Sequence, residues 1–197
     1  MSFDTLAALT LFAFVGAITP GPNNIMIMAS GANFGLRRSL PHALGIAVGC
    51  GIMVFLSGLG LTGLFEVFPL ALTVMRGASV VYLLYLAWRL ATAAAPEAGG
   101  EARRPLSFLG AALFQWVNPK AWALVLVAIA AYLPQPSPAP ALAAGLIFVV
   151  VSLPSVLIWA KLGEGLRHVL ADRRRLRIFN ATMACLLLAS LWPILRG

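Results

Sequence analysis

The stretch Thr19-Pro20-Gly21-Pro22-Asn23-Asn24 lies inside a long apolar segment near the start of the chain. Proline removes a backbone donor and clashes with the preceding turn, and glycine weakens a helix further, so two prolines around a glycine predict a break in that helix. In lipid, the freed backbone groups cost several kcal/mol each unless something satisfies them. The break is therefore expected to be buried in protein or to line a polar cavity.

A second stretch, Gln115-Trp116-Val117-Asn118-Pro119-Lys120, interrupts another apolar segment in the same way. Asn118 is a favourable N-cap and Pro119 suits the first position of a helix, so a new half-helix is predicted to begin here. Both breaks fall about twelve to fourteen residues into their segments. They are therefore expected near the middle of a bilayer.

The composition excludes a water-soluble protein. Of the 197 residues, 61% are hydrophobic and only 10% are charged, with a mean hydropathy of +0.94, whereas soluble domains carry about 25% charged residues. We predict an all-α integral membrane protein, because charge-free apolar runs of about 20 residues can each cross a bilayer. The six predicted spans are Thr5–Ala29, Ser39–Leu64, Pro69–Leu90, Leu106–Leu133, Ala141–Ala160 and Ile178–Leu195.

The two breaks divide these spans into two groups of three, each opening with a broken helix. An odd number of spans per copy forces the second copy to be inverted, which is the arrangement in which many transporters bind substrate at discontinuous helices. The prediction is one transmembrane domain over residues 1–197, with repeat halves of about 1–92 and 104–197 and a cytoplasmic linker of about 93–103.

The basic residues predict the orientation. Lys and Arg concentrate in the loops after the first, third and fifth predicted spans, and by the positive-inside rule these loops are cytoplasmic and both termini are outside. Nucleic-acid binding is the other interpretation of a net charge of +8, but here the arginines lie in short loops beside apolar segments. These residues are Arg37, Arg38, Arg89, Arg103, Arg104, Lys161, Arg167, Arg173, Arg174, Arg175 and Arg177.

The breaks carry the candidate binding site. Helix N-termini favour anions, and Lys120 has no carboxylate within any span to pair with, so a substrate carboxylate would suit both. The alternative is that Lys120 extends toward the interface or bonds backbone carbonyls at the break. The predicted substrate-binding residues are Thr19, Pro20, Gly21, Pro22, Asn23, Asn24, Gln115, Asn118, Pro119 and Lys120.

Other small and aromatic residues receive structural interpretations. Cys50 and Cys185 are expected to be small core residues, and Trp88 and Trp159 to belong to interfacial belts. The glycine-rich second span, with Gly45-x-x-x-Gly49, predicts close helix packing, either within the chain or in a homodimer. No metal ion or cofactor is expected, and no phosphate-binding loop of the ATPase type occurs.

Several motifs resemble the LysE/RhtB-type family of amino-acid exporters. Beside the two breaks they are Gly31 to Arg37, Gly45 to Gly49, Gly77-Ala78, Tyr82-Leu83, Leu86-Ala87-Trp88 and Asn118-Pro119-Lys120-Ala121.

The resemblance implies secondary transport of amino acids or close derivatives outward across the bacterial inner membrane, without enzymatic activity. The runs Thr19 to Ile25 and Phe114 to Asn118 look most like the cysteine/O-acetylserine branch, and homoserine or threonine are related neutral substrates. The lack of carboxylates within the spans argues against a cationic substrate side chain such as that of lysine. The alternatives are a membrane thiol-disulfide electron carrier, which would need a cysteine beside each break, and a scaffold subunit without transport.

Overall fold

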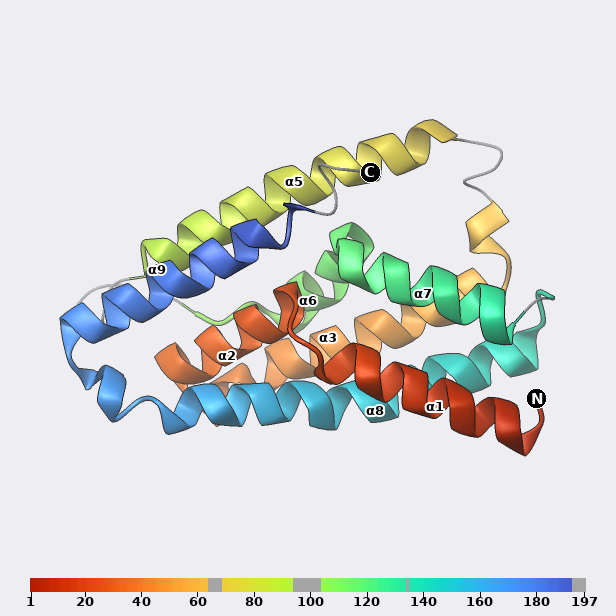
Figure 1. The fold of residues 1–197 in the computed structure, drawn as a ribbon, viewed down its shortest axis with the longest axis horizontal. Helices are drawn as coiled ribbons and strands as arrows, with labels where there is room; N and C mark the ends of the chain where they lie inside the picture. The colour runs from red at the N-terminus through yellow and green to blue at the C-terminus, as the bar shows by residue number, and fades with distance from the viewer. Residues whose placement is uncertain (64–68, 94–103, 134, 193–197) are drawn as a thin grey trace.

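The structure is a computed structural model that describes residues 1–63, 69–93, 104–133 and 135–192. Every regular element in these residues is helical (Figure 1). The α-helices are α1 (Phe3–Ile18), α2 (Pro22–Phe34), α3 (Leu36–Gly58), α5 (Pro69–Ala91), α6 (Phe108–Phe114), α7 (Pro119–Tyr132), α8 (Pro138–Gly165) and α9 (Arg173–Ala189). The short 3-10 helices are η1 (Leu61–Gly63), η2 (Gln115–Val117) and η3 (Val169–Ala171).

The helices break where the sequence predicts. Pro22 is the first residue of α2, and the axes of α1 and α2 differ by 55°. Pro119 is the first residue of α7, Asn118 is its N-cap, and α7 is bent by 67° from Phe108–Val117. Pro41 and Pro154, in contrast, lie inside the continuous helices α3 and α8. A proline by itself therefore does not break a helix in this protein.

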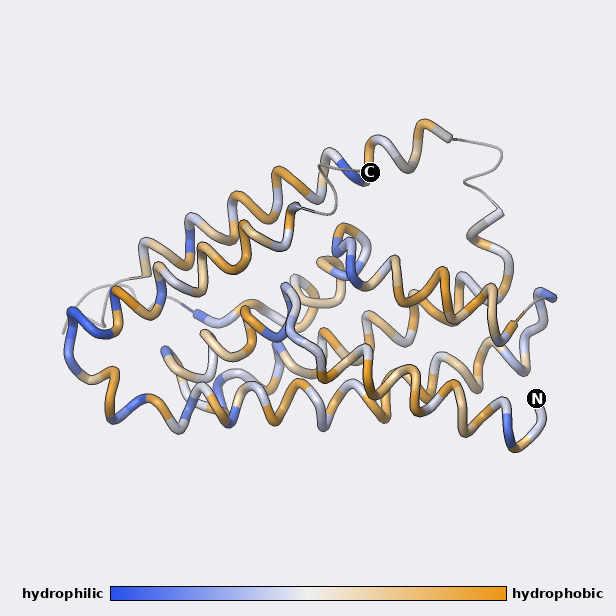
Figure 2. Tube along the Cα trace, in the orientation of Figure 1, coloured by the Kyte–Doolittle hydropathy of each residue, from blue (hydrophilic) through white to orange (hydrophobic). Residues whose placement is uncertain are grey.

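Length and hydropathy identify the membrane-crossing helices. Within the described residues, α3 and α8 are each long and apolar enough to cross a bilayer, and the two bent pairs bring the number to as many as four. Figure 2 shows hydrophilic residues interrupting these apolar helices at the breaks and gathering at the end of the molecule where α8 is followed by α9. The chain is thus a multi-helix membrane protein with polar groups placed inside its apolar body.

Several predicted loop boundaries are wrong. Arg37 and Arg38 were expected in a loop but lie in the first turn of α3, and Lys161 lies in α8. The arginines from Arg173 to Arg177 were also expected in a loop, but α9 begins at Arg173 and carries them in its first turns. Asp172 makes this start favourable, because its carboxylate accepts a hydrogen bond from the backbone N–H of Arg175 at 2.9 Å. Of the predicted linker 93–103, only Ala93 is among the described residues.

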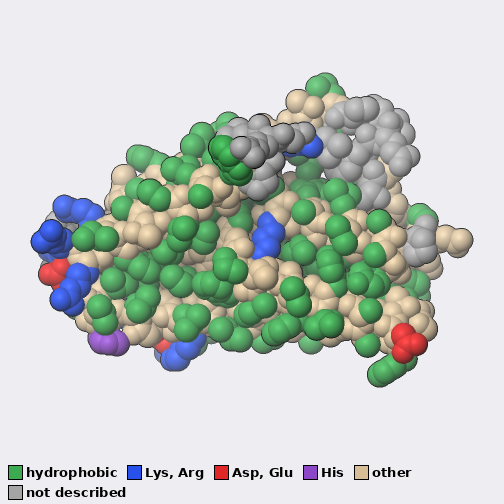
Figure 3. Space-filling model, viewed as in Figure 1, with side chains coloured by type: hydrophobic (Ala, Val, Ile, Leu, Met, Phe, Trp, Pro, Cys, Tyr) green, Lys and Arg blue, Asp and Glu red, His purple; other side chains and the backbone are tan. Residues whose placement is uncertain are grey.

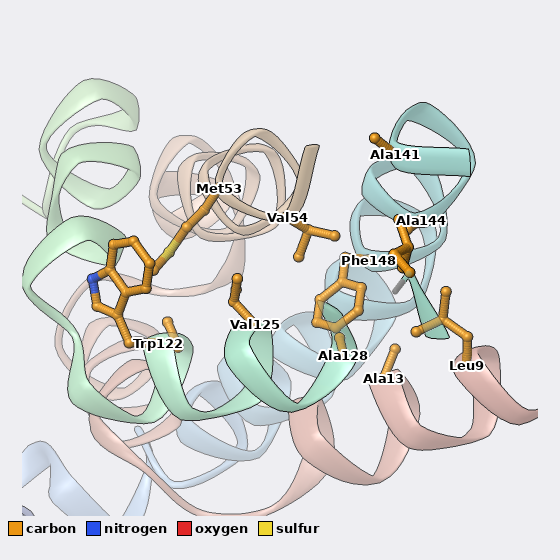
Figure 4. Close-up of a cluster of buried hydrophobic side chains, with 12 residues drawn as sticks. Leu9, Ala13, Met53, Val54, Trp122, Val125, Ala128, Ala141, Ala144 and Phe148 are labelled. Atoms are coloured by element: carbon orange, nitrogen blue, oxygen red, sulfur yellow. The ribbon is translucent and has the colours of Figure 1, made fainter. Parts of the chain in front are cut away.

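The helices form one body with a paired extension. α3 contacts α2, α6, α7 and α8, and α8 also contacts α1 and α2, so α3 and α8 form the centre. α5 and α9 lie side by side along the upper part of Figure 1. Figure 4 shows the largest buried cluster, where side chains of α1, α3, α7 and α8 meet. Leu9 of α1 and Trp122 and Val125 of α7 pack here against Met53 of α3 and Phe148 of α8.

The glycines of the second predicted span pack within the chain. A Cβ added at Gly49 would lie 2.7 Å from Ala112 Cα of α6, and one added at Gly58 would lie 2.8 Å from the Cβ of Ala141 in α8. Gly31 of α2 and Gly163 of α8 are closer still, each facing a backbone carbonyl of the other helix. Close packing inside the protein is therefore confirmed.

A cluster of charged groups stabilises the basic end of the protein, which Figure 3 shows at the left. The Glu164 carboxylate accepts a hydrogen bond from Leu36 N–H at 2.9 Å and forms an ion pair with Lys161 at 2.6 Å. The hydrogen bond from Lys161, followed by the one from Leu36, lowers the pKa of Glu164 below its ordinary value. Glu164 thus provides the acceptor that the glycine N-cap of α3, Gly35, cannot supply.

Candidate functional site

The two breaks face one cavity. Its empty space, including its open mouth, is about 540 Å³, and it is lined by α1, α2, α3, α7 and α8. Polar residues from both breaks line it, and most of the remaining wall is apolar. The lining residues with polar side chains are Asn23, Asn24, Cys50, Asn118, Lys120 and Ser152.

A hydrogen-bonded amide cluster joins the breaks. Asn23 donates to Gln115 Oε1 at 2.8 Å, and Gln115 returns a hydrogen bond to Asn23 Oδ1 at 3.1 Å. Gln115 also donates to the Ala111 carbonyl, and its Oε1 accepts from Asn118 at 3.4 Å and from the Cys50 thiol at 3.3 Å. Gln115 is fully buried, so its amide fixes the relative position of α2, α3 and the second break.

Lys120 ties the second break to the first. Its ammonium donates to the Thr19 carbonyl, to Thr19 Oγ1 at 2.8 Å and to the Pro20 carbonyl at 3.2 Å. These oxygens lie at the C-terminal end of α1, where unpaired carbonyls and the helix dipole favour a cation. The alternative that Lys120 bonds backbone carbonyls at the break is therefore what the geometry shows.

Gly21 allows this approach. A Cβ added at Gly21 would lie 2.5 Å from Lys120 Cδ and 3.1 Å from Lys120 Nζ. The glycine backbone is extended, so its conformation alone would accept other residues. The lack of a side chain at Gly21 matters because the lysine stem occupies the space.

The start of α2, at the wall of the cavity, has uncapped backbone donors. Its N-cap residue, Gly21, makes no side-chain cap, and the first N–H groups of a helix have no partner within the helix. The Asn24 amide is directed the other way, donating to the carbonyls of Ala17 at 2.8 Å and Thr19 at 2.7 Å. The Asn24 side chain thereby supplies a donor to the carbonyl groups at the end of α1. The backbone N–H groups of Asn23 and Asn24 remain suited to an anion.

The structure assigns the ten predicted residues to two tasks. Gly21, Asn23, Asn24, Asn118 and Lys120 line the cavity. The other five form the breaks or hold them together without lining it, namely Thr19, Pro20, Pro22, Gln115 and Pro119.

Sequence reasoning missed eleven of the sixteen cavity residues and misplaced two other residues. Cys50, Phe148 and Ser152 are among those missed, and only Ser152, a polar residue in an apolar span, carried a signal. Trp159 is not a belt residue, because its indole N–H donates to the Ile18 carbonyl at the break at 3.0 Å. Cys185 is exposed rather than in the core, since α9 turns its other face inward.

The comparisons with known proteins identify the family of the chain. The family model for the LysE type translocator matches residues 14–190, and the chain belongs to this family. It is therefore a multi-pass membrane transporter and not an enzyme, which also removes the thiol-disulfide carrier and the scaffold subunit as alternatives.

Curated relatives match a large part of the chain. The cysteine/O-acetylserine efflux protein of Escherichia coli (strain K12) is 32% identical over 136 residues, covering 68% of this chain and 69% of the relative. The protein of the same name from Shigella flexneri is 32% identical over 131 residues, covering 66% and 67%. No solved structure matches the chain.

Proposed function

We propose that the protein exports small neutral amino acids or close derivatives, of the cysteine, O-acetylserine, homoserine or threonine type, outward across the inner membrane by secondary transport. The observation that carries this proposal is the cavity between the two breaks, which is lined by residues of both. The efflux of cysteine and O-acetylserine named for the relatives supports the choice of substrate.

The substrate carboxylate is assigned to the start of α2. The uncapped N–H groups at Asn23 and Asn24 supply directed donors, and Lys120 supplies the positive charge within the same cavity. Lys120 would then move from the carbonyls of Thr19 and Pro20 toward the carboxylate, or share its three donors between them. The connection between the breaks and the binding of the substrate carboxylate would thus both use the Lys120 ammonium group.

The remaining wall suits a small, uncharged side chain. Phe148 and Leu124 supply apolar surface, and Cys50 and Ser152 supply weakly polar groups. No acidic residue is among those lining this cavity in the described part of the chain. A second ammonium group, such as that of a lysine substrate, would have no counter-ion there.

The proposed architecture is six spans in a 3+3 inverted repeat. α1–α2 and α6–α7 are the two broken spans, and each is followed by two further helices along the chain, α3 and α5 in one half and α8 and α9 in the other. In Figure 1 the chain reverses direction from each of these six units to the next. This order supports the repeat that the breaks predict.

The proposed orientation places the basic loops in the cytoplasm and both termini outside. Ser137 is a suitable labelling site, because its side chain makes no cap hydrogen bond with α8, and Arg174 is an exposed site at the other end. In a Cys50→Ser, Cys185→Ser background, an impermeant thiol reagent applied outside should label Ser137→Cys and not Arg174→Cys. The reverse pattern would invert the proposed direction.

A homodimer remains a separate prediction. The glycines that suggested it, including Gly49 and Gly58, contact helices of the same chain, so they do not support a second protomer. Mass measurement of the protein in nanodiscs would test it, and a fully active monomer would contradict it.

Transport is tested directly with purified protein in proteoliposomes. Exchange of radiolabelled O-acetyl-L-serine against internal amino acids should occur with small neutral amino acids and fail with L-lysine. Equal exchange with lysine, or no exchange with any amino acid by folded protein, would contradict the proposed substrate class.

A further inference from the structure

A second pocket opens toward the basic end of the protein. It is formed by α2, α3 and α5 together with the residues before α6, and its empty space, including its open mouth, is about 610 Å³. Its polar lining residues are Ser30, Asn33, His42, Arg89 and Arg104. None of them belongs to the cavity between the breaks.

His42 is the least explained residue of this pocket. Its side chain is 2% exposed, and neither ring nitrogen has a hydrogen-bond partner within the residues that the structure describes. An imidazole carries at least one N–H donor in either protonation state. Because a buried polar group without a partner is costly, an unpaired imidazole lining a pocket indicates a ligand with an acceptor.

The other lining residues give the pocket a positive charge. Arg89 and Arg104 both line it, and no acidic residue is among its described lining residues. The Arg89 guanidinium also lies over the ring of Tyr85, 5.9 Å from its centroid, which holds it at the end of α5. The Arg104 guanidinium and the His42 imidazole suit a carboxylate, which accepts hydrogen bonds in pairs.

The pocket lies in line with the cavity between the breaks. Both are lined by α2 and α3, one through Asn23 and Cys50 and the other through Ser30 and His42. These residues are seven or eight positions apart on each helix, which corresponds to about 10–12 Å along the axis. Buried apolar side chains occupy the helix positions between them, namely Ile27 and Ala43, together with Ile46, which also lines the cavity between the breaks.

We infer that this pocket binds the carboxylate of a small amino acid arriving from the cytoplasm, before it reaches the cavity between the breaks. The inference rests on the proposed function for the identity of the ligand. The positive groups at the basic end would concentrate the carboxylate, and the apolar cluster between the two sites would separate them. Arg104 and His42 are its principal contacts.

The test uses the full chain with His168→Asn, which leaves His42 as its only histidine. In phosphatidylcholine nanodiscs, the ring nitrogens of ¹⁵N-labelled His42 should shift saturably on titration with O-acetyl-L-serine. The matched probe O-acetyl-L-serinamide, which lacks the carboxylate, should produce no saturable shift. No shift with the acid, or the same shift with the amide, would overturn the inference.

Matched arginine variants separate local binding from general charge. Arg104→Gln should weaken the His42 response roughly tenfold, whereas Arg174→Gln, which removes an exposed arginine outside the pocket, should change it by less than about twofold. Equal weakening by both variants would overturn the pocket as the site.

Two further arms distinguish other sources of the signal. Lys120→Met should leave the His42 response in place. Loss of the response in this variant would assign the signal to the cavity between the breaks. The response should also persist in phosphatidylglycerol nanodiscs, and its loss in them would show that a lipid headgroup occupies the pocket. Either loss would overturn the inference. Binding without exchange in proteoliposomes would instead refute only the proposed function.

Discussion

The side-chain amides of Asn23 and Gln115 exchange two hydrogen bonds, at 2.8 and 3.1 Å, although the residues are 92 positions apart in the sequence. Each residue belongs to one of the two helix breaks. The pair therefore connects the breaks inside the protein, and Gln115 extends the connection to Asn118 and Cys50. Deformation of one break should be transmitted to the other through this pair.

The first prediction concerns the energy of this pair. Asn23→Ala and Gln115→Ala should each lower the free energy of unfolding. The double variant should lower it by less than the sum of the two single losses, and the difference, the coupling energy, should be about 1–2 kcal/mol. Thermal unfolding in detergent measures the cycle. The control cycle combines Asn23 with Asn180, whose side chain bonds Asn33 and the Ala93 carbonyl instead, and it should be additive. Coupling of equal size there would contradict the specific connection.

A second prediction tests the contact between α2 and α8. Gly31→Ala would place a Cβ against the Ala160 carbonyl, and the helices must separate to accept it. Gly31→Ala should therefore lower the free energy of unfolding by about 1–3 kcal/mol. Gly77→Ala is the control, because nothing lies within 4 Å of its added Cβ, and it should be neutral or stabilising by about 0.5–1 kcal/mol. Similar losses for both variants would show that the contact is not the cause.

The third prediction is a pH dependence at the basic end. The hydrogen bonds from Lys161 and Leu36 hold the pKa of Glu164 below its ordinary value of 4.5. A lowered pKa means that its contribution to stability is complete above pH 4.5 and is lost as the pH falls through the folded-state pKa. Glu164→Gln should therefore be less stable than the wild type at pH 7, with the difference in unfolding temperature shrinking below pH 4.5. A difference independent of pH would contradict this assignment.

The sequence predicted the breaks but not what holds them. Prolines beside glycine and asparagine identified the first residues of α2 and α7, since their effect on a helix is local. The partners of Lys120 and Gln115 lie on other helices and depend on how the helices pack. Local sequence carries no such information, so the carbonyls of Thr19 and the amide of Asn23 could not be assigned from it.

Two further differences have separate causes. Trp159 was expected at the interface because it lies near the end of an apolar span, but the packing of α8 against α1 brings its indole to the Ile18 carbonyl. Arg173 was expected in a loop because of its charge, but Asp172 caps the helix start beside it. Packing between helices therefore explains the position of Trp159, and the capping residue Asp172 explains why Arg173 is helical.

The central claim is that the cavity between the two breaks binds the substrate carboxylate with the help of Lys120. The most direct measurement is the affinity of O-acetyl-L-serine for purified Lys120→Met in nanodiscs, compared with the wild type and with Lys161→Met. Lys161 is the control because its ammonium pairs with Glu164 at the basic end, away from the cavity. Lys120→Met should bind roughly ten- to a hundredfold more weakly while remaining folded, and Lys161→Met should bind like the wild type. Wild-type affinity in folded Lys120→Met would contradict the claim.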